Sequence, residues 1–167
     1  MGVDVTDDAV PQPDLAGAGA GLRFAVVCGR FNGHVTLRLL DGARRGFAAC
    51  GVADDAIRVE WVPGAFELPL AAKTFAQTGH YAAVVAVGCV IRGGTAHFEY
   101  VAGQAAEGLQ QAGLDTGVPC VFGVLTTEDL QQALDRSEGP GGHNVGEEGA
   151  CTAVEMAKLL ASIRTDA

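Results

Sequence analysis

From Leu22 onward, short apolar runs alternate with longer stretches in which apolar residues recur every three or four positions. The short runs predict strands at Leu22–Cys28, Ile57–Val62, Ala82–Ile91 and Val118–Leu125. The longer stretches predict helices at Gly33–Cys50, Ala65–Gln77, His97–Ala112 and about Glu147–Ile163. A further short helix is expected to start at Thr126–Asp129, with a threonine as its N-cap and acidic residues in its first turn.

This alternation of strands with helices is typical of βαβ units, in which successive strands are parallel. The longest run, Ala82–Ile91, is apolar throughout and rich in valine, as expected for a strand that is buried on both faces of a parallel sheet. The pattern therefore predicts an α/β protein, a three-layer α/β/α sandwich of the flavodoxin-like type with a four-stranded parallel sheet.

The charge balance narrows the possible partners. The 167 residues include 11 Lys and Arg against 20 Asp and Glu, a net charge of −9, which argues against binding to nucleic acid or to an anionic membrane. No apolar run approaches the ~20 residues of a membrane span. Residues 1–21 contain four Asp and no Lys or Arg, so we expect a flexible acidic N-terminal segment, followed by one domain over residues 22–167.

The cysteines and histidines do not form a recognisable metal or disulfide pattern. The five cysteines are an odd number without a CxxC pair, and three of them (Cys28, Cys89 and Cys120) lie in apolar runs. We interpret them as reduced core residues of a cytoplasmic protein. The four histidines are scattered without HExxH or paired Cys/His spacing, so no metal site is expected.

Unusual residues follow each predicted strand. In open parallel sheets, ligands bind outside the carboxyl ends of the strands. The four segments expected at this edge are Arg30–Asn32, Val62–Glu67, Ile91–His97 and Thr126–Thr127. Gly93–Thr95 leads into a helix and could bind an anion through backbone N–H groups, or could be an ordinary glycine-rich turn.

Four side chains carry candidate chemistry, each with a plainer alternative. His97 could transfer protons, because imidazole titrates near neutral pH, or it could be a surface or capping residue. Phe31 could stack on a heteroaromatic ring or belong to the core. Glu67 could bind ligand hydroxyls or simply be a favourable acid in a first helical turn. Arg136 could bind phosphate or only favour the end of a short helix.

Several common sites are absent. The sequence has no GxGxxG after the first strand, no GxxxxGK[ST] and no GxSxG, which disfavours a dinucleotide-binding Rossmann protein, a P-loop enzyme and an α/β-hydrolase.

Longer motifs resemble one family. The segments Gly29–Asn32, Trp61–Pro69 and Gly88–Val101, in this order and spacing, strongly resemble the 6,7-dimethyl-8-ribityllumazine synthases. Three further segments, Phe122–Glu128, Gln132–Arg136 and Ala153–Ala157, extend the resemblance over roughly residues 22–160. The stretches VPGAFELP and VIRGGTAHFEYV are its most specific parts.

The resemblance implies a cofactor-independent enzyme of riboflavin biosynthesis that requires no metal. It condenses 5-amino-6-(D-ribitylamino)uracil with 3,4-dihydroxy-2-butanone 4-phosphate to 6,7-dimethyl-8-ribityllumazine and releases phosphate and water. The imine forms between the two substrates, which agrees with the presence of only two lysines, Lys73 and Lys158.

The resemblance also implies roles for individual residues. Phe31 would stack on the pyrimidine, while Cys89, Val90 and Ile91 would line its pocket. Ala65, Phe66 and Glu67 would hold the ribityl chain, Gly94 and Thr95 would bind the phosphate, and His97 would transfer protons. Phe122 and Arg136 would come from the adjacent subunit of a homo-oligomer, with Arg136 on the phosphate.

One segment departs from the common bacterial pattern of the family. Residues 137–148 lack the usual lysine near the phosphate, and Val145 stands at its position. The stretch His143-Asn144-x-Gly146-Glu147 instead resembles the fungal form, which is pentameric. The resemblance therefore implies a pentamer or decamer, with a 60-subunit capsid as the alternative, and phosphate contact by Arg136 alone or together with His143.

Two other functions are compatible with the pattern. The missing lysine would suit a non-catalytic paralogue that binds flavins or lumazines or serves as a scaffold. A flavodoxin-like FMN carrier is the third reading, although no Ser/Thr-rich phosphate loop follows the first strand.

Overall fold

The computed structural model of the chain describes residues 9–166. Its centre is one sheet of four parallel strands in the order β2-β1-β3-β4. The strands are β1 (Phe24–Gly29), β2 (Ile57–Val62), β3 (Ala83–Ile91) and β4 (Cys120–Thr127). The four-stranded parallel sheet predicted from the sequence is confirmed.

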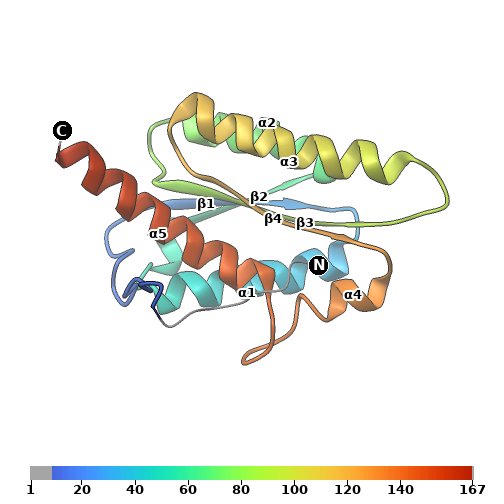
Figure 1. Cartoon of the computed structure of the whole chain (residues 1–167), viewed down its shortest axis with the longest axis horizontal. Helices are drawn as coiled ribbons and strands as arrows, with labels where there is room; N and C mark the ends of the chain where they lie inside the picture. Colours follow the sequence, from blue (N-terminus) through green and yellow to red (C-terminus); the bar gives the residue numbers. More distant parts are fainter. Residues whose placement is uncertain (1–8, 167) are drawn as a thin grey trace.

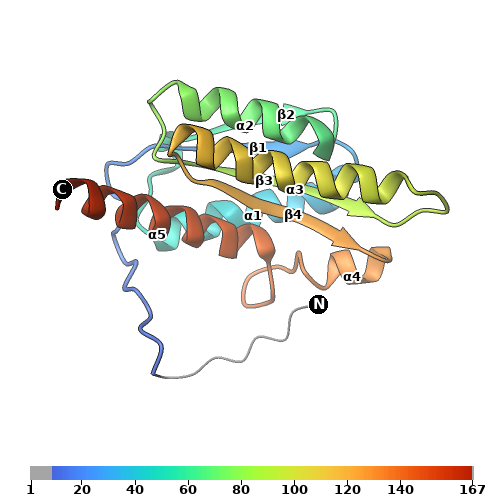
Figure 2. The same ribbon diagram turned by 45° about the horizontal axis from the view of Figure 1, so that its top comes forward.

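Helices cover both faces of this sheet (Figure 1). One face carries α1 (Gly33–Ala49) and α5 (Val145–Thr165), and the other carries α2 (Leu68–Gln77) and α3 (His97–Thr116). The short helix α4 (Leu130–Leu134) follows β4, and two 3₁₀ turns, η1 (Asp54–Ala56) and η2 (Ala65–Glu67), flank β2. The turned view in Figure 2 shows the same layers, which confirm the three-layer α/β/α sandwich.

The two inner strands form the centre of the core. All six residues of β1 are buried, and in β3 only the last residue, Ile91, is partly exposed. Alternate residues of these strands enter two apolar clusters, one beneath α1 and α5 and the other beneath α2 and α3. Burial on both faces explains why the run that became β3 is apolar throughout rather than alternating.

The helix boundaries differ from the sequence-based expectation in physically clear ways. Helix α3 continues to Thr116, four residues beyond the expected end, and stops where Gly117 adopts a left-handed conformation (φ 67°). The predicted threonine N-cap of α4 is wrong. Asp129 is the N-cap and accepts a hydrogen bond from Gln132 N (2.8 Å), and no acidic residue lies in the first turn.

Helices α1 and α5 approach each other closely where the last helix begins. A Cβ added to Gly146 would lie 1.9 Å from the carbonyl oxygen of Leu39, so only glycine allows the two helix backbones to pack at this distance. Asn144 caps α5 by accepting hydrogen bonds from Gly146 N and Glu147 N, so the helix starts at Val145, two residues earlier than the periodicity indicates.

The segment before β1 contacts the domain. Leu15 and Ala18 pack against the cluster beneath α1 and α5, and Gly19 N donates a hydrogen bond to Cys50 O (2.8 Å). Residues 1–8, which belong to the predicted flexible segment, lie outside the described residues. That segment and its boundary at residue 22 stay predictions.

All five cysteines are free. Cys28, Cys50 and Cys89 are buried, whereas Cys120 and Cys151 are partly exposed. Within residues 9–166, no helix combines the length and apolar character needed to cross a membrane.

Candidate functional site

A pocket opens at the point in the sheet where the strand order changes direction. Strand β1 lies between β2 and β3, so the crossovers from β1 to β2 and from β2 to β3 run in opposite directions across the sheet. Ligands of doubly wound sheets bind at such a switch point. A cavity of about 660 Å³ lies there, and its wall includes nine residues that the sequence suggested: Phe31, Ala65, Phe66, Glu67, Cys89, Val90, Ile91, Thr95 and His97.

The loop after β1 displays Phe31 to solvent. Phe31 is 74% exposed, so its alternative reading as a core residue is wrong. Backbone hydrogen bonds from Arg30 N to Val62 O (2.9 Å) and from Phe31 N to Pro63 O (3.1 Å) fix the loop against the end of β2. An aromatic ring held at a pocket wall by its backbone is available for stacking on a planar ligand.

Asn32 joins the same loop to β3. Its backbone is left-handed (φ 57°), which makes it the one non-glycine residue of the described chain with positive φ. Its side-chain Nδ2 donates to Cys89 O at 2.9 Å. Asparagine tolerates this backbone conformation better than most residues, and the hydrogen bond across 57 positions compensates the remaining cost.

Glu67 caps the start of a helix and also lines the pocket, so the two readings that the sequence left open are compatible. Its Oε2 accepts a hydrogen bond from Gly64 N (2.9 Å) in a capping box at the start of η2. The same side chain lines the pocket. The cap orients the carboxylate, and its second oxygen can accept hydrogen bonds from a bound hydroxyl group.

Cys89, Val90 and Ile91 form the inner wall at the end of β3. Cys89 and Val90 are buried in the chain. Burial raises the pKa of the Cys89 thiol to about 11, so it is protonated at neutral pH. Its chemistry is that of a small apolar wall rather than of a nucleophile.

The turn between β3 and α3 contributes Thr95 and His97 to the pocket. His97 is the first residue of α3, and its backbone N lies 3.4 Å from Thr95 Oγ1. Gly94 lies in the same turn but is not part of the pocket wall. A Cβ at either Gly93 or Gly94 would meet no atom within 4 Å, so the turn faces open space.

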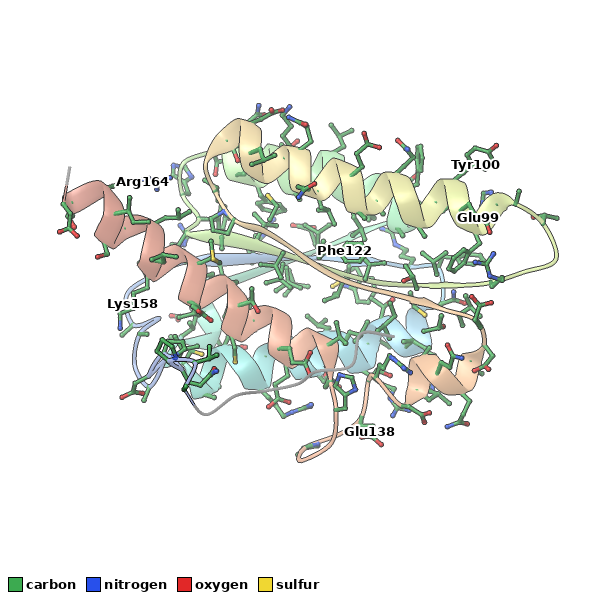
Figure 3. The ribbon with its side chains drawn as sticks, in the orientation of Figure 1. Glu99, Tyr100, Phe122, Glu138, Lys158 and Arg164 are labelled. Carbon is green, nitrogen blue, oxygen red and sulfur yellow. The ribbon has the colours of Figure 1, made fainter. Side chains whose placement is uncertain are left out.

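Besides Gly94, three suggested residues lie outside this pocket. Phe122 lies on the edge strand β4, 39% exposed, in a second hollow between α3 and α5 (Figure 3). Arg136 follows α4 and donates from Nη1 to Gln132 O (2.9 Å). His143 precedes α5, with Nε2 3.1 Å from Glu148 Oε1. One chain therefore does not bring Arg136 to its own pocket.

The pocket also contains residues that the sequence reasoning missed. Phe98, Tyr100 and Val101 extend the wall along α3, whereas Pro63, Gly64 and Gly93 belong to the turns that the sequence already placed at this edge. His97 and Val101 are four residues apart on one face of α3, a spacing that could have identified Val101. Tyr100 lies at the outer end of this wall, near Glu99 in Figure 3.

The described residues offer no metal centre. Residues 9–166 contain no group of three or more His, Cys, Asp or Glu side chains placed to hold an ion. The pocket can hold a planar ligand between the Phe31 ring and the wall at the end of β3. The Glu67 carboxylate can accept hydrogen bonds from ligand hydroxyl groups, and the His97 imidazole can transfer protons.

Together these features define a flavodoxin-like α/β protein with an open small-molecule pocket at the carboxyl edge of its sheet. A family model described as 6,7-dimethyl-8-ribityllumazine synthase matches residues 21–161 of the 167-residue chain, and the chain belongs to this family. Membership implies an enzyme, a transferase, with lumazine synthase activity in riboflavin biosynthesis.

Proposed function

We propose that this protein condenses 5-amino-6-(D-ribitylamino)uracil with 3,4-dihydroxy-2-butanone 4-phosphate to 6,7-dimethyl-8-ribityllumazine. The proposal rests on the observation that residues from separate family motifs meet at one cavity. Nine residues that the family motifs single out come from the ends of three strands and the start of α3, and all nine line the same cavity. Its volume of about 660 Å³ is within the range of small-molecule sites.

The residues suit the two substrates in different parts of the cavity. Phe31 stacks on the pyrimidine, whose edge lies against Cys89, Val90 and Ile91. The ribityl chain lies along Ala65 and Phe66, and its hydroxyl groups donate to Glu67. The butanone phosphate lies at Gly94 and Thr95, beside His97. This arrangement is supported by the exposure of Phe31 and by the orientation of Glu67 through Gly64.

The reaction needs positioning more than strong chemical activation. The substrate amine attacks the ketone, and water leaves as the imine forms between the two substrates. Phosphate is then eliminated, and the second amine adds to the remaining carbonyl and closes the ring with loss of a second water. His97 moves the protons of these steps. Neither lysine is needed as an amine: Lys73 pairs with Asp115 (2.8 Å), Lys158 lies on α5 (Figure 3), and neither lines the pocket. Holding two reactive substrates in contact supplies most of the acceleration.

The site is completed by a second copy of the chain. Phe122 and Arg136 of one subunit reach the pocket of its neighbour, where Arg136 binds the phosphate, alone or together with His143. Support comes from their absence from the pocket of their own chain. We propose a pentamer or decamer in the cytoplasm. Five 17.0 kDa chains give about 85 kDa, whereas the alternative 60-subunit capsid gives about 1 MDa, so native mass separates them.

The test is to mix the purified protein with both substrates and follow lumazine absorbance and phosphate release. Reactions without protein and with one substrate omitted give the background. Acceleration above that background, with one phosphate released per lumazine, is expected. No acceleration would favour a non-catalytic binder, and a yellow protein that carries FMN as purified would favour a flavin carrier.

A further inference from the structure

Arg92 connects three elements at the rim of the pocket. It follows the last residue of β3, and its backbone N donates to Thr127 O at the end of β4 (2.9 Å). Its guanidinium Nη1 donates to Glu99 in the first turn of α3, and its Nε lies 2.7 Å from Glu128 Oε2, just after β4. The guanidinium carbon also lies 4.2 Å from the centre of the Phe98 ring, which lines the pocket.

The turn that follows Arg92 has little other support. A Cβ added to Gly93 or Gly94 would meet no atom within 4 Å. Thr95 Oγ1 accepts a long hydrogen bond from His97 N (3.4 Å). The ion pairs of Arg92 therefore tie the N-terminal side of the turn to the helix at its C-terminal side. A planar, forked guanidinium can do this because it binds two carboxylates and an aromatic ring at once.

The same contacts determine the charge beside the turn. Glu99 and Glu128 are two carboxylates at one arginine, in a protein of net charge −9. Their hydrogen bonds raise the pKa of Arg92, and the Arg92 hydrogen bond holds the pKa of Glu99 below its usual range. Glu99 is therefore held in its ionised form, and without Arg92 the two carboxylates beside the turn would face an incoming phosphate unshielded.

We propose that Arg92 is a positioning residue for the phosphate end of the pocket: it orients the Gly93–Thr95 turn and neutralises Glu99 and Glu128 beside it. Because its guanidinium is occupied by two carboxylates, it does not serve as the phosphate ligand itself. The inference rests on the proposed function, which assigns the butanone phosphate to this turn.

Three variants separate the two effects. Arg92→Ala removes both the orientation and the charge, Arg92→Lys keeps the charge without the fork, and Arg92→Ala combined with Glu99→Gln and Glu128→Gln removes the repulsion without restoring the fork. Arg58→Ala is the matched control, since Arg58 pairs with Glu60 on β2 and neither lines the pocket. The readouts are kcat, the KM of each substrate and calorimetric titration with inorganic phosphate.

For Arg92→Ala we expect the KM of the butanone phosphate and the Kd of inorganic phosphate to rise about tenfold, with the KM of the ribitylaminouracil changed less than about twofold. The triple variant should regain phosphate affinity, while its kcat stays below that of the wild type because the turn is still not oriented. Arg92→Lys should bind phosphate nearly as the wild type does but with a lower kcat, because a point charge does not orient the turn. A rise in salt should reduce the defect of Arg92→Ala by screening the carboxylates.

A folded Arg92→Ala protein with unchanged phosphate KM and unchanged phosphate Kd would overturn the proposal. If Arg92→Ala does not fold, Arg92→Lys decides, and kinetics identical to the wild type would refute the positioning role. A wild-type protein that makes no lumazine refutes the proposed function instead. In that case the phosphate titration still tests Arg92, and the proposal falls if the wild type binds no phosphate.

Discussion

Asn144 connects the loop that departs from the family pattern to two helices. Asn144 is only 2% exposed. Oδ1 accepts hydrogen bonds from Gly146 N (2.9 Å) and Glu147 N (3.2 Å) and so caps α5. Nδ2 donates to Arg38 O (3.1 Å) on α1 and to Glu138 O (2.8 Å) in the loop. Replacing Asn144 by alanine removes all four contacts.

The expected cost follows from these contacts. Loss of an N-cap costs about 1 kcal/mol. Each of the two part-buried hydrogen bonds that Nδ2 donates adds about 1 kcal/mol. The free energy of unfolding should therefore fall by about 3 kcal/mol, which for a chain of this size lowers Tm by roughly 10 °C.

Thermal unfolding at fixed protein concentration measures this effect, because assembly also stabilises the folded chain. Asn144→Asp keeps the capping oxygen without the donors and should lie between wild type and Asn144→Ala. In Gly42→Ala the added Cβ would lie 2.0 Å from Asn144 Oδ1 and should displace the side chain with a similar loss. Gly33→Ala, where nothing lies within 4 Å, is the control. An Asn144→Ala protein within about 2 °C of wild type would refute the reasoning.

Three further predictions concern the site. His97→Ala should slow turnover modestly, because the substrates react without catalysis, and should flatten the pH–rate profile; an unchanged profile would remove His97 from the mechanism. Arg136→Ala should raise the KM of the butanone phosphate through loss of a charge-assisted contact, and an unchanged KM would assign Arg136 elsewhere. Because burial raises the pKa of Cys89 to about 11, only about one thiol in a thousand is ionised at pH 8, so iodoacetamide labelling of Cys89 should be slow and rise about tenfold per pH unit. The pKa of Cys89 is about 11 in the folded chain and near the ordinary 9.0 in the unfolded chain, so the folded chain binds more protons between these values. The free energy of unfolding should therefore fall as pH rises from about 9 towards 11, and it should fall less in Cys89→Ala.

The parts of the fold that local patterns determine were predictable. The apolar run that became β3 and the alternation with helices indicated a parallel sheet, and the location of the pocket then follows from the rule for carboxyl edges. The exposure of Phe31 was not predictable from composition, because it depends on hydrogen bonds from its loop to the last residue of β2 and to the residue after it.

Contacts between distant segments account for what the sequence did not reveal. Asn32 and Cys89 are 57 residues apart, and Asn144 and Arg38 are 106 residues apart. Nothing in the local pattern around Arg92 indicates that it pairs with Glu128. The threonine cap of α4 was predicted wrongly because β4 continues through Thr127, whose Oγ1 donates to Asp129 O (2.9 Å), and Asp129 is the residue that caps the helix.

The central claim is that the pocket of one chain forms an active site with Arg136 of another. The measurement is the activity, at a butanone phosphate concentration far below the KM of Arg136→Ala, of assemblies reconstituted from equal amounts of two impaired proteins, Arg136→Ala and the double variant Phe31→Ala/His97→Ala. If the site is shared between neighbours, about a quarter of the sites in mixed assemblies combine an intact pocket with an intact arginine, and activity should return to about a quarter of wild type. Activity no higher than the mean of the two separate variants would contradict a shared site.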